Sequence, residues 1–191
     1  MLRIRNYLQI ARNIMSDSII EMHPNRITID ALGPPGQRVF LLQAVDAYQK
    51  VSLKLEKQQA SVLAQGILQF LDELGERFPE RDWLTLEPYG ADLLLEDPVE
   101  ILFVIGQMGL GYDENEHALV LVAQEITAEE DETGRVVRFW TTPGQMRAMS
   151  KHVETVVSKG REICSMCQQP IDPKGHFCPK SNGRQLKNSM A

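Results

Sequence analysis

The sequence has no cysteine outside one stretch of fifteen residues, and it has no long apolar run. All three cysteines lie in "CSMCQQPIDPKGHFC", residues 164–178. A helix that crosses a membrane needs about 18 consecutive apolar residues, whereas the longest apolar stretch, "ILFVIGQMGLGY", is broken by glycines and is typical of a strand and a turn. We therefore expect no membrane partner, and the gathering of three thiols near one end of the chain requires an explanation.

Signature motifs of catalysis are also missing. The chain has no nucleophile elbow, no phosphate-binding loop, no HExxH and no dinucleotide fingerprint. The prolines of "GPPG" have no amide donor, so this stretch favours a hairpin turn over a phosphate cradle. We interpret His117 and His152 as surface or packing histidines, and His23 as a loop histidine. The sequence thus predicts no catalytic residue, and it leaves open whether the protein is an enzyme.

The composition is that of an ordinary globular protein, but the charge is unevenly placed. Of the 191 residues, 43% are hydrophobic and 24% are charged, which suits one medium domain with a small appendage. The net charge of −6 divides into −10 over residues 1–150 and +4 over residues 151–191. The acidic body argues against broad nucleic-acid binding, while the basic side chains Lys174, Lys180, Arg184 and Lys187 leave a local contact open.

Strand-like and helix-like segments alternate over residues 25–160. "RITIDALG", "VFLLQA" and "VSLKLE" are typical of strands, and apolar residues then recur at helical spacing. "EILFVIGQMGL", "HALVLVAQEI" and "GRVVRFWT" predict three more strands before a helix that starts at "TPGQ". Thr142 is suited to cap this helix, Pro143 to its first position and Gln145 to a capping box. The pattern predicts an α+β domain in which two helices, beginning near Gln58 and Pro143, pack on an antiparallel sheet.

The two halves of this domain share one order of elements. We read each half as strand, strand, helix, with "LEKQQ" and "TTPGQ" in equivalent places, so a duplicated domain is one interpretation and chance is the other. The predicted division is an N-terminal extension (1–24), the α+β domain (25–160), a zinc knuckle (161–184) and a tail (185–191). We expect the basic residues 1–14 to contribute little to stability, which makes Met15 a candidate start.

Cys164, Cys167, His176 and Cys178 have the spacing of a metal site. Two cysteines separated by two residues place both sulfurs on one side of a tight turn, and the other two ligands project to the same side of an extended segment. Three thiolates and one imidazole suit tetrahedral zinc. Because four protein ligands leave no position for water, we expect a structural Zn²⁺ site. A redox CxxC pair and three unconnected cysteines are the alternatives.

At these residues "GREICSMCQQPIDPKGHFCPKSNGR" resembles the C-terminal signature of the domain of unknown function 3090 family. "GPPGQRVFLLQA", "LEKQQ", "PVEILFVIG" and "TPGQMRAM" resemble its other recurring stretches in the same order, from about Asn25 to Arg184. The resemblance implies a cytoplasmic bacterial protein with a zinc knuckle, and it implies no activity, because the family has none assigned. Lys180 stands where an arginine is more usual and Arg184 where an aromatic residue often follows, while all four ligand positions match.

Three classes of function remain. We favour a protein-interaction or adaptor module whose zinc knuckle supports a surface for an unidentified protein partner. The alternatives are an enzyme without a recognisable motif and a nucleic-acid-associated zinc protein. Arg38, Lys57 and Gln59 are candidates to converge near a sheet edge and a helix start, although solvated charges are the simpler interpretation. Without an export signal and with clustered thiols, a reducing cytoplasm is the expected setting.

Overall fold

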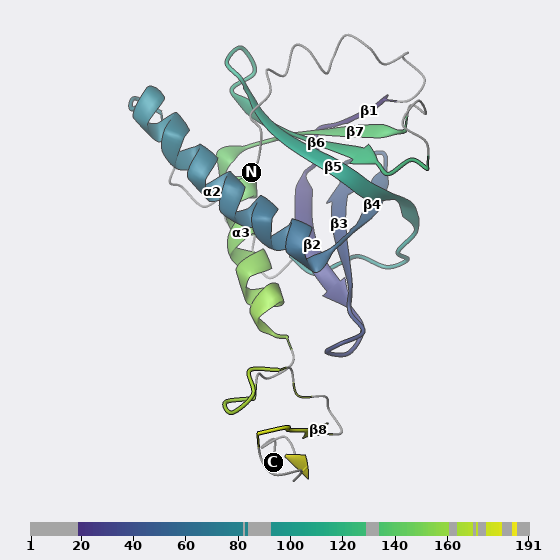
Figure 1. Cartoon of the computed structure of the whole chain (residues 1–191). Helices are drawn as coiled ribbons and strands as arrows, with labels where there is room; N and C mark the ends of the chain where they lie inside the picture. The colour runs from purple at the N-terminus through teal and green to yellow at the C-terminus, as the bar shows by residue number, and fades with distance from the viewer. Residues whose placement is uncertain are drawn as a thin grey trace.

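The computed structural model describes residues 19–81, 83, 93–128, 134–160, 164–169, 171, 175–180 and 185–186. Its strands are β1 (Ile19–Met22), β2 (Arg26–Leu32), β3 (Val39–Val45), β4 (Lys50–Leu55), β5 (Ile101–Asp113), β6 (Ala118–Glu125), β7 (Val136–Thr141), β8 (His176–Phe177) and β9 (Gln185–Leu186). Its helices are α2 (Lys57–Arg77) and α3 (Pro143–Ser158). The predicted α+β class is confirmed, and both helices begin within one residue of the predicted positions (Figure 1).

One seven-stranded sheet, in the order β1-β7-β6-β5-β4-β3-β2, forms the body of the protein. Its hairpin-connected pairs are antiparallel, as predicted. The pairs β4–β5 and β1–β7 are parallel, so the expectation of a purely antiparallel sheet is corrected to a mixed one. Strands β4 and β5 are parallel because the long connection through α2 returns the chain to the end of the sheet where β4 began.

Helices α2 and α3 contact each other on one side of this sheet (Figure 1). Each helix buries apolar side chains at spacings of three and four residues, which form one stripe on a helix of 3.6 residues per turn. The core between the helices and the sheet includes Leu63, Ile67, Leu71, Met146, Met149, Val153, Ile29, Leu42, Leu53, Leu121 and Phe139. The body therefore has a hydrophobic core of its own, independent of the C-terminal cysteines.

The strand pairings reveal an internal duplication. Strand β5 has a register shift at Gly106, and it pairs in parallel with β4 before the shift and antiparallel with β6 mainly after it. Strands β1 and β2, which residues 23–25 separate, make the same two kinds of pairing. Strand β1 pairs in parallel with β7, and β2 pairs antiparallel with β3. Strands β1 and β2 together are thus the counterpart of the single strand β5.

The register agrees between the halves. Leu42 on β3 lies opposite Leu53 on β4, and Leu121 on β6 lies opposite Phe139 on β7. Leu53 lies three positions before Glu56, which caps α2. Phe139 likewise lies three positions before Thr142, which caps α3. We conclude that each half is a repeat of strand, strand, strand and helix, which corrects the predicted strand, strand, helix.

The third residue of each helix, Gln59 in α2 and Gln145 in α3, joins the repeats to their parallel neighbours. The Gln59 side-chain oxygen accepts from the Glu56 N–H at 2.8 Å, and its amide nitrogen donates to the Ile105 carbonyl at 3.3 Å. The oxygen of Gln145 accepts from the Thr142 N–H at 2.9 Å, and its nitrogen donates to the Pro24 carbonyl at 2.7 Å. The "LEKQQ" and "TTPGQ" stretches therefore do occupy equivalent places.

Two strands lie in segments predicted as an extension and a tail. The segment 1–24 contributes β1 to the sheet, where Met22 is fully buried, and the segment 185–191 contributes β9, which pairs with β8. Residues 1–14 and Met15 lie outside the described residues. Within the described part of the chain, no helix is long and apolar enough to cross a membrane.

Candidate metal centre

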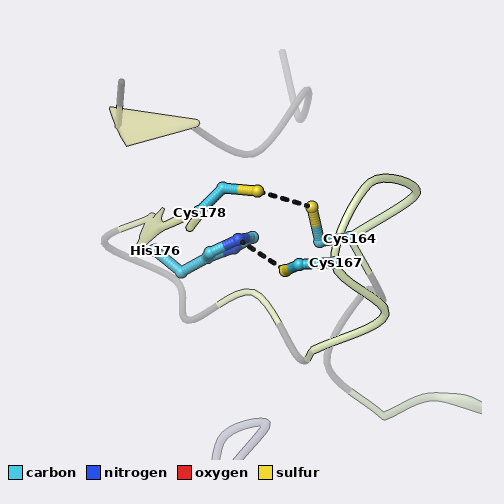
Figure 2. Close-up of side chains that lie close together, drawn as sticks. All are labelled: Cys164, Cys167, His176 and Cys178. Atoms are coloured by element: carbon cyan, nitrogen blue, oxygen red, sulfur yellow. Dashed lines mark hydrogen bonds between the residues drawn. The ribbon is translucent and has the colours of Figure 1, made fainter. Parts of the chain in front are cut away.

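The first arm of the cluster is the turn at residues 164–169. The Cys164 N–H donates to the Gln169 carbonyl at 2.9 Å, and the Gln168 N–H donates to the Cys164 carbonyl at 2.8 Å. Gln168 has a φ of 62°, in the left-handed region that lets a short loop close on itself. This closed turn places the sulfurs of Cys164 and Cys167 on the same side of the loop, as the CxxC spacing predicted (Figure 2).

The second arm is the short strand β8 and the residue after it. Gly175, with a φ of 92°, directly precedes β8, which pairs with β9. Successive side chains of an extended segment point to opposite sides, so His176 and Cys178 point the same way while Phe177 points away. Figure 2 shows the imidazole and the Cys178 sulfur directed at the two sulfurs of the first arm.

The four ligand atoms have the separations of a tetrahedral metal site. The sulfurs of Cys164 and Cys178 are 3.8 Å apart, and the Cys167 sulfur lies 3.5 Å from His176 Nε2. All four atoms lie within 4.8 Å of one another. Around a zinc ion with bonds of about 2.3 Å to sulfur and about 2.0 Å to nitrogen, tetrahedral geometry gives edges of about 3.8 and 3.5 Å. The residues therefore fit a tetrahedral ion.

The electrostatics of the cluster also favour a cation. The Cys167 N–H lowers the pKa of the Cys164 thiol below its ordinary value, with a further contribution from the Met166 N–H. The Gln169 N–H acts in the same direction on Cys167, but desolvation and the adjoining Cys164 and Cys178 thiols together raise the pKa of Cys167. The pKa of Cys164 is thus lowered and that of Cys167 is raised, and a bound divalent cation would favour the thiolate form of both.

The burial of the cluster indicates a closed site. Cys164 is 1% exposed and Cys178 is 0% exposed, while Cys167 and His176 are half-buried. All three cysteines are free thiols, so the cluster has the reduced form that metal binding needs. Four protein ligands complete a tetrahedral shell without water, which is the arrangement of a structural site. The prediction from the sequence that these four residues converge is confirmed, and they can hold a metal ion.

The remaining histidines lie apart from this cluster. His117 is exposed in the turn between β5 and β6, and His23 stacks on Trp140 with ring centroids 5.7 Å apart. His152 on α3 faces Asp30 on β2, with Nε2 3.6 Å from Oδ2. Sequence reasoning missed this last pair, because 122 positions separate its members and nothing local connects them.

Arg38, Lys57 and Gln59 were candidates to converge, and the side chains of Arg38 and Lys57 do approach each other. Arg38, directly before β3, donates from Nη1 to the Val156 carbonyl at 2.8 Å. A methyl carbon added at Gly160 would lie 3.6 Å from Arg38 Nη2 and 3.3 Å from Lys57 Nζ, so both cations meet at the end of α3. Gln59 is occupied with the β5 carbonyls instead.

A groove of about 420 Å³ lies between the first two turns of α2 and the middle of β5. Its walls are mainly apolar, with Val62 and Leu63 on the helix side and Met108 and Leu110 on the strand side. In the other repeat, α3 packs closely on β2, the counterpart of this part of β5. The groove is therefore a place where the two repeats differ.

The fold and the cluster together define a class: an α+β protein of duplicated design that carries a C-terminal Cys₃His site able to bind a metal. The family model of proteins of unknown function DUF3090 matches residues 22–178, and the chain belongs to that family. The match starts at the last residue of β1 and ends at Cys178, so it covers both repeats except for the first three residues of β1, and its range includes all four ligands. Neither the curated proteins nor the solved structures contain a match.

Proposed function

We propose that the cluster of Cys164, Cys167, His176 and Cys178 holds one structural Zn²⁺. Thiolate and imidazole ligands at tetrahedral separations suit zinc better than they suit magnesium or calcium, which prefer oxygen. Where the structure describes them, the arms that carry the ligands consist of a turn and the two-residue strand β8, which pairs with β9. The ion would therefore supply the order of this zinc knuckle, while the body relies on its own core.

The function that we propose is protein interaction, with the zinc knuckle as the contact element. The observation that carries the proposal is the exposure of Phe177, which is 68% exposed although both of its neighbours are ligands. Met166, between the two ligands of the first arm, is 44% exposed. Large apolar side chains on a rigid, metal-ordered support are typical anchors of protein interfaces. A protein partner with an apolar patch is the occupant that suits them.

The proposal includes a cellular compartment, the cytoplasm. Three thiols that must stay reduced to bind zinc suit the cytoplasm of a bacterial cell, as the family resemblance implied. The acidic charge of the body favours a protein partner over nucleic acid, which would meet repulsion outside the basic C-terminal region.

The test uses a partner recovered from native lysate with the tagged, zinc-loaded protein. Phe177→Ser combined with Met166→Ser should abolish recovery of that partner while zinc content stays at one ion per chain. Tyr48→Ser is the matched control, because Tyr48 is 96% exposed on the β3–β4 hairpin, away from the ligands. If the double variant recovers the same partner as the control, the knuckle is not the contact element.

A further inference from the structure

The second half of strand β5 has a free edge. Strand β4 pairs with β5 only as far as Val104, where the chain turns into α2. On the same edge, the Gln59 side chain donates to the carbonyls of Ile105 and Gly106. From there to Asp113, β5 pairs with β6 on its other edge, and no hydrogen bond between described residues reaches its backbone from the side of α2. Every second residue of an antiparallel strand directs its N–H and C=O away from its partner, so these groups line the free edge.

The groove between α2 and β5 lies along this free edge. Its apolar walls are Val62 and Leu63 on α2 and Met108 and Leu110 on β5. Val62 is 41% exposed, and a Cβ atom built on Gly109 would meet nothing within 4 Å, so both walls are open to solvent. The groove thus combines apolar side chains with backbone groups that can pair with another strand.

The other repeat covers the corresponding surface. Ile29 on β2 lies opposite Leu42, and Leu110 on β5 lies opposite Leu121. Because Leu42 and Leu121 occupy equivalent places in the two repeats, Ile29 and Leu110 are equivalent too. Ile29 is fully buried where α3 packs on β2, whereas Leu110 is only half-buried. The apolar surface at the groove therefore lacks the cover that its counterpart has.

An extended peptide has the chemistry to fill this groove. Its backbone can pair with the free strand edge, and every second side chain would contact the apolar walls while the others face solvent. Glu56 is the only charged residue that lines the groove, and Lys57 lies beside Gly160 instead. Residues 1–150 carry a net charge of −10. Basic side chains on the peptide would thus be attracted, and acidic ones repelled.

We propose that this groove binds an extended, basic segment of a partner protein, which adds a strand to the free edge of β5 where β4 ends. Apolar residues of the segment alternate with lysine or arginine. The groove belongs to the body of the fold, so the proposal does not rest on the zinc knuckle or on its partner.

The experiment titrates the zinc-loaded full chain into a fluorescent heptapeptide of alternating lysine and valine with blocked ends, and it follows binding by fluorescence anisotropy. The peptide should bind saturably, and the amide resonances of Met108 and Leu110 should shift. A peptide in which glutamate replaces lysine should bind at least about tenfold more weakly. Phe177→Ser combined with Met166→Ser should leave the affinity unchanged, which separates this groove from the knuckle.

Val62→Lys tests the helix wall with little risk to the fold, because Val62 is exposed and lysine favours a helix more than valine does. The substitution places a charge in the apolar wall and should weaken peptide binding about tenfold or more. Gln69→Lys, at an exposed position two turns further along α2, is the matched control and should bind the peptide as the wild type does.

Methylation of the peptide nitrogens tests the strand pairing. Two peptides, one N-methylated at every valine and one at every lysine, carry their methyl groups on opposite edges of the extended backbone. The peptide whose methylated edge faces β5 loses its hydrogen-bond donors and should bind about tenfold or more weakly than the parent.

The proposal is overturned if the peptide shows no saturable binding, if both methylated peptides bind as well as the parent, or if Val62→Lys and Gln69→Lys bind it equally well. Equal affinity for the glutamate peptide overturns the assignment of a basic segment. A protein dimer that dissociates when the peptide is added assigns the groove to a second copy, and tighter binding by the chain that starts at Met15 assigns it to residues 1–14.

Discussion

At the scale of single residues, Phe177 and its two neighbours show how little chain the metal cluster needs. Cys178 is fully buried and Phe177 is 68% exposed, although they are adjacent. The alternation of an extended segment produces this difference, since it points every second side chain at the cluster. One face of a three-residue stretch thus carries two of the candidate ligands, and the opposite face is exposed.

Replacing one ligand should lower the affinity for zinc sharply. Cys178→Ser exchanges a thiolate for a neutral hydroxyl, and His176→Asn removes the imidazole, so both variants should lose most of their bound zinc under competition with a chelator. His117→Asn is the matched control, because His117 is an exposed turn residue. Retention of a full equivalent of zinc by both ligand variants would contradict the assignment.

The ion pair of Glu125 and Arg135 gives a prediction about pH. Hydrogen bonds from the Arg135 guanidinium lower the pKa of Glu125 below its ordinary value. A lowered pKa in the folded state means that the stabilisation is present above the pKa of the unfolded state and is lost as the pH falls through the folded value. Glu125→Gln should therefore lower the free energy of unfolding at pH 7 by about 1 kcal/mol or less.

In urea unfolding, the difference between wild type and Glu125→Gln should shrink as the pH falls below 4. Glu154→Gln, at an exposed position on α3, should have a smaller effect at every pH. A difference that stays constant down to acid pH would contradict the role given to this pair.

At the scale of elements, the sequence predicted both helices but neither strand β1 nor the two parallel pairings. Helices α2 and α3 are marked by local signals, namely a 3.6-residue stripe and a glutamine at the third position. Strand β1 has only four residues, Ile19–Met22, and it is held by β7, which follows more than a hundred residues later. Parallel pairing of this kind depends on tertiary contacts, which a local pattern does not carry.

The two equivalent glutamines should differ in their contribution to stability. Gln145 is 4% exposed, and it bonds both the helix cap and the Pro24 carbonyl. Gln145→Ala removes the donor that satisfies the buried Pro24 carbonyl and should cost about 2–3 kcal/mol. Gln59→Ala should cost about 1 kcal/mol, because Gln59 is only half-buried.

Gln69→Ala, on an exposed part of α2, should cost less than about 0.5 kcal/mol. Chemical denaturation of the three variants measures these differences. Equal costs for Gln145 and Gln69 would contradict the role of the buried amide in joining the repeats.

Truncation from the N-terminus should show where the sheet begins. Starting the chain at Met15 should leave the melting temperature nearly unchanged, as predicted from the sequence. Starting it at Asn25 removes β1 together with Met22, which is fully buried, and should cost at least about 2–5 kcal/mol. A large loss in the first truncation, or none in the second, measured by thermal unfolding, would contradict this division.

At the scale of the whole molecule, the protein combines a duplicated body with a C-terminal appendage that carries the candidate metal site. The metal site could be predicted from the sequence because its four ligands fall within fifteen residues. The meeting of Arg38, Lys57 and Gly160 could not, because it requires the start of β3, the start of α2 and the end of α3 to converge. Local spacing brings the four metal ligands together, whereas the packing of the body brings the two cations together.

Metal content tests the central claim most directly. Protein purified under reducing conditions, without added metal, should contain one zinc per chain. Removal of the zinc by a chelator should make the chain after Gly160 sensitive to protease, while the helix and sheet content of the body persists. Zinc-finger sites bind with about 10–16 kcal/mol at neutral pH, so the ion should survive purification. A protein that contains no zinc under these conditions, or whose body unfolds when zinc is removed, would contradict the account.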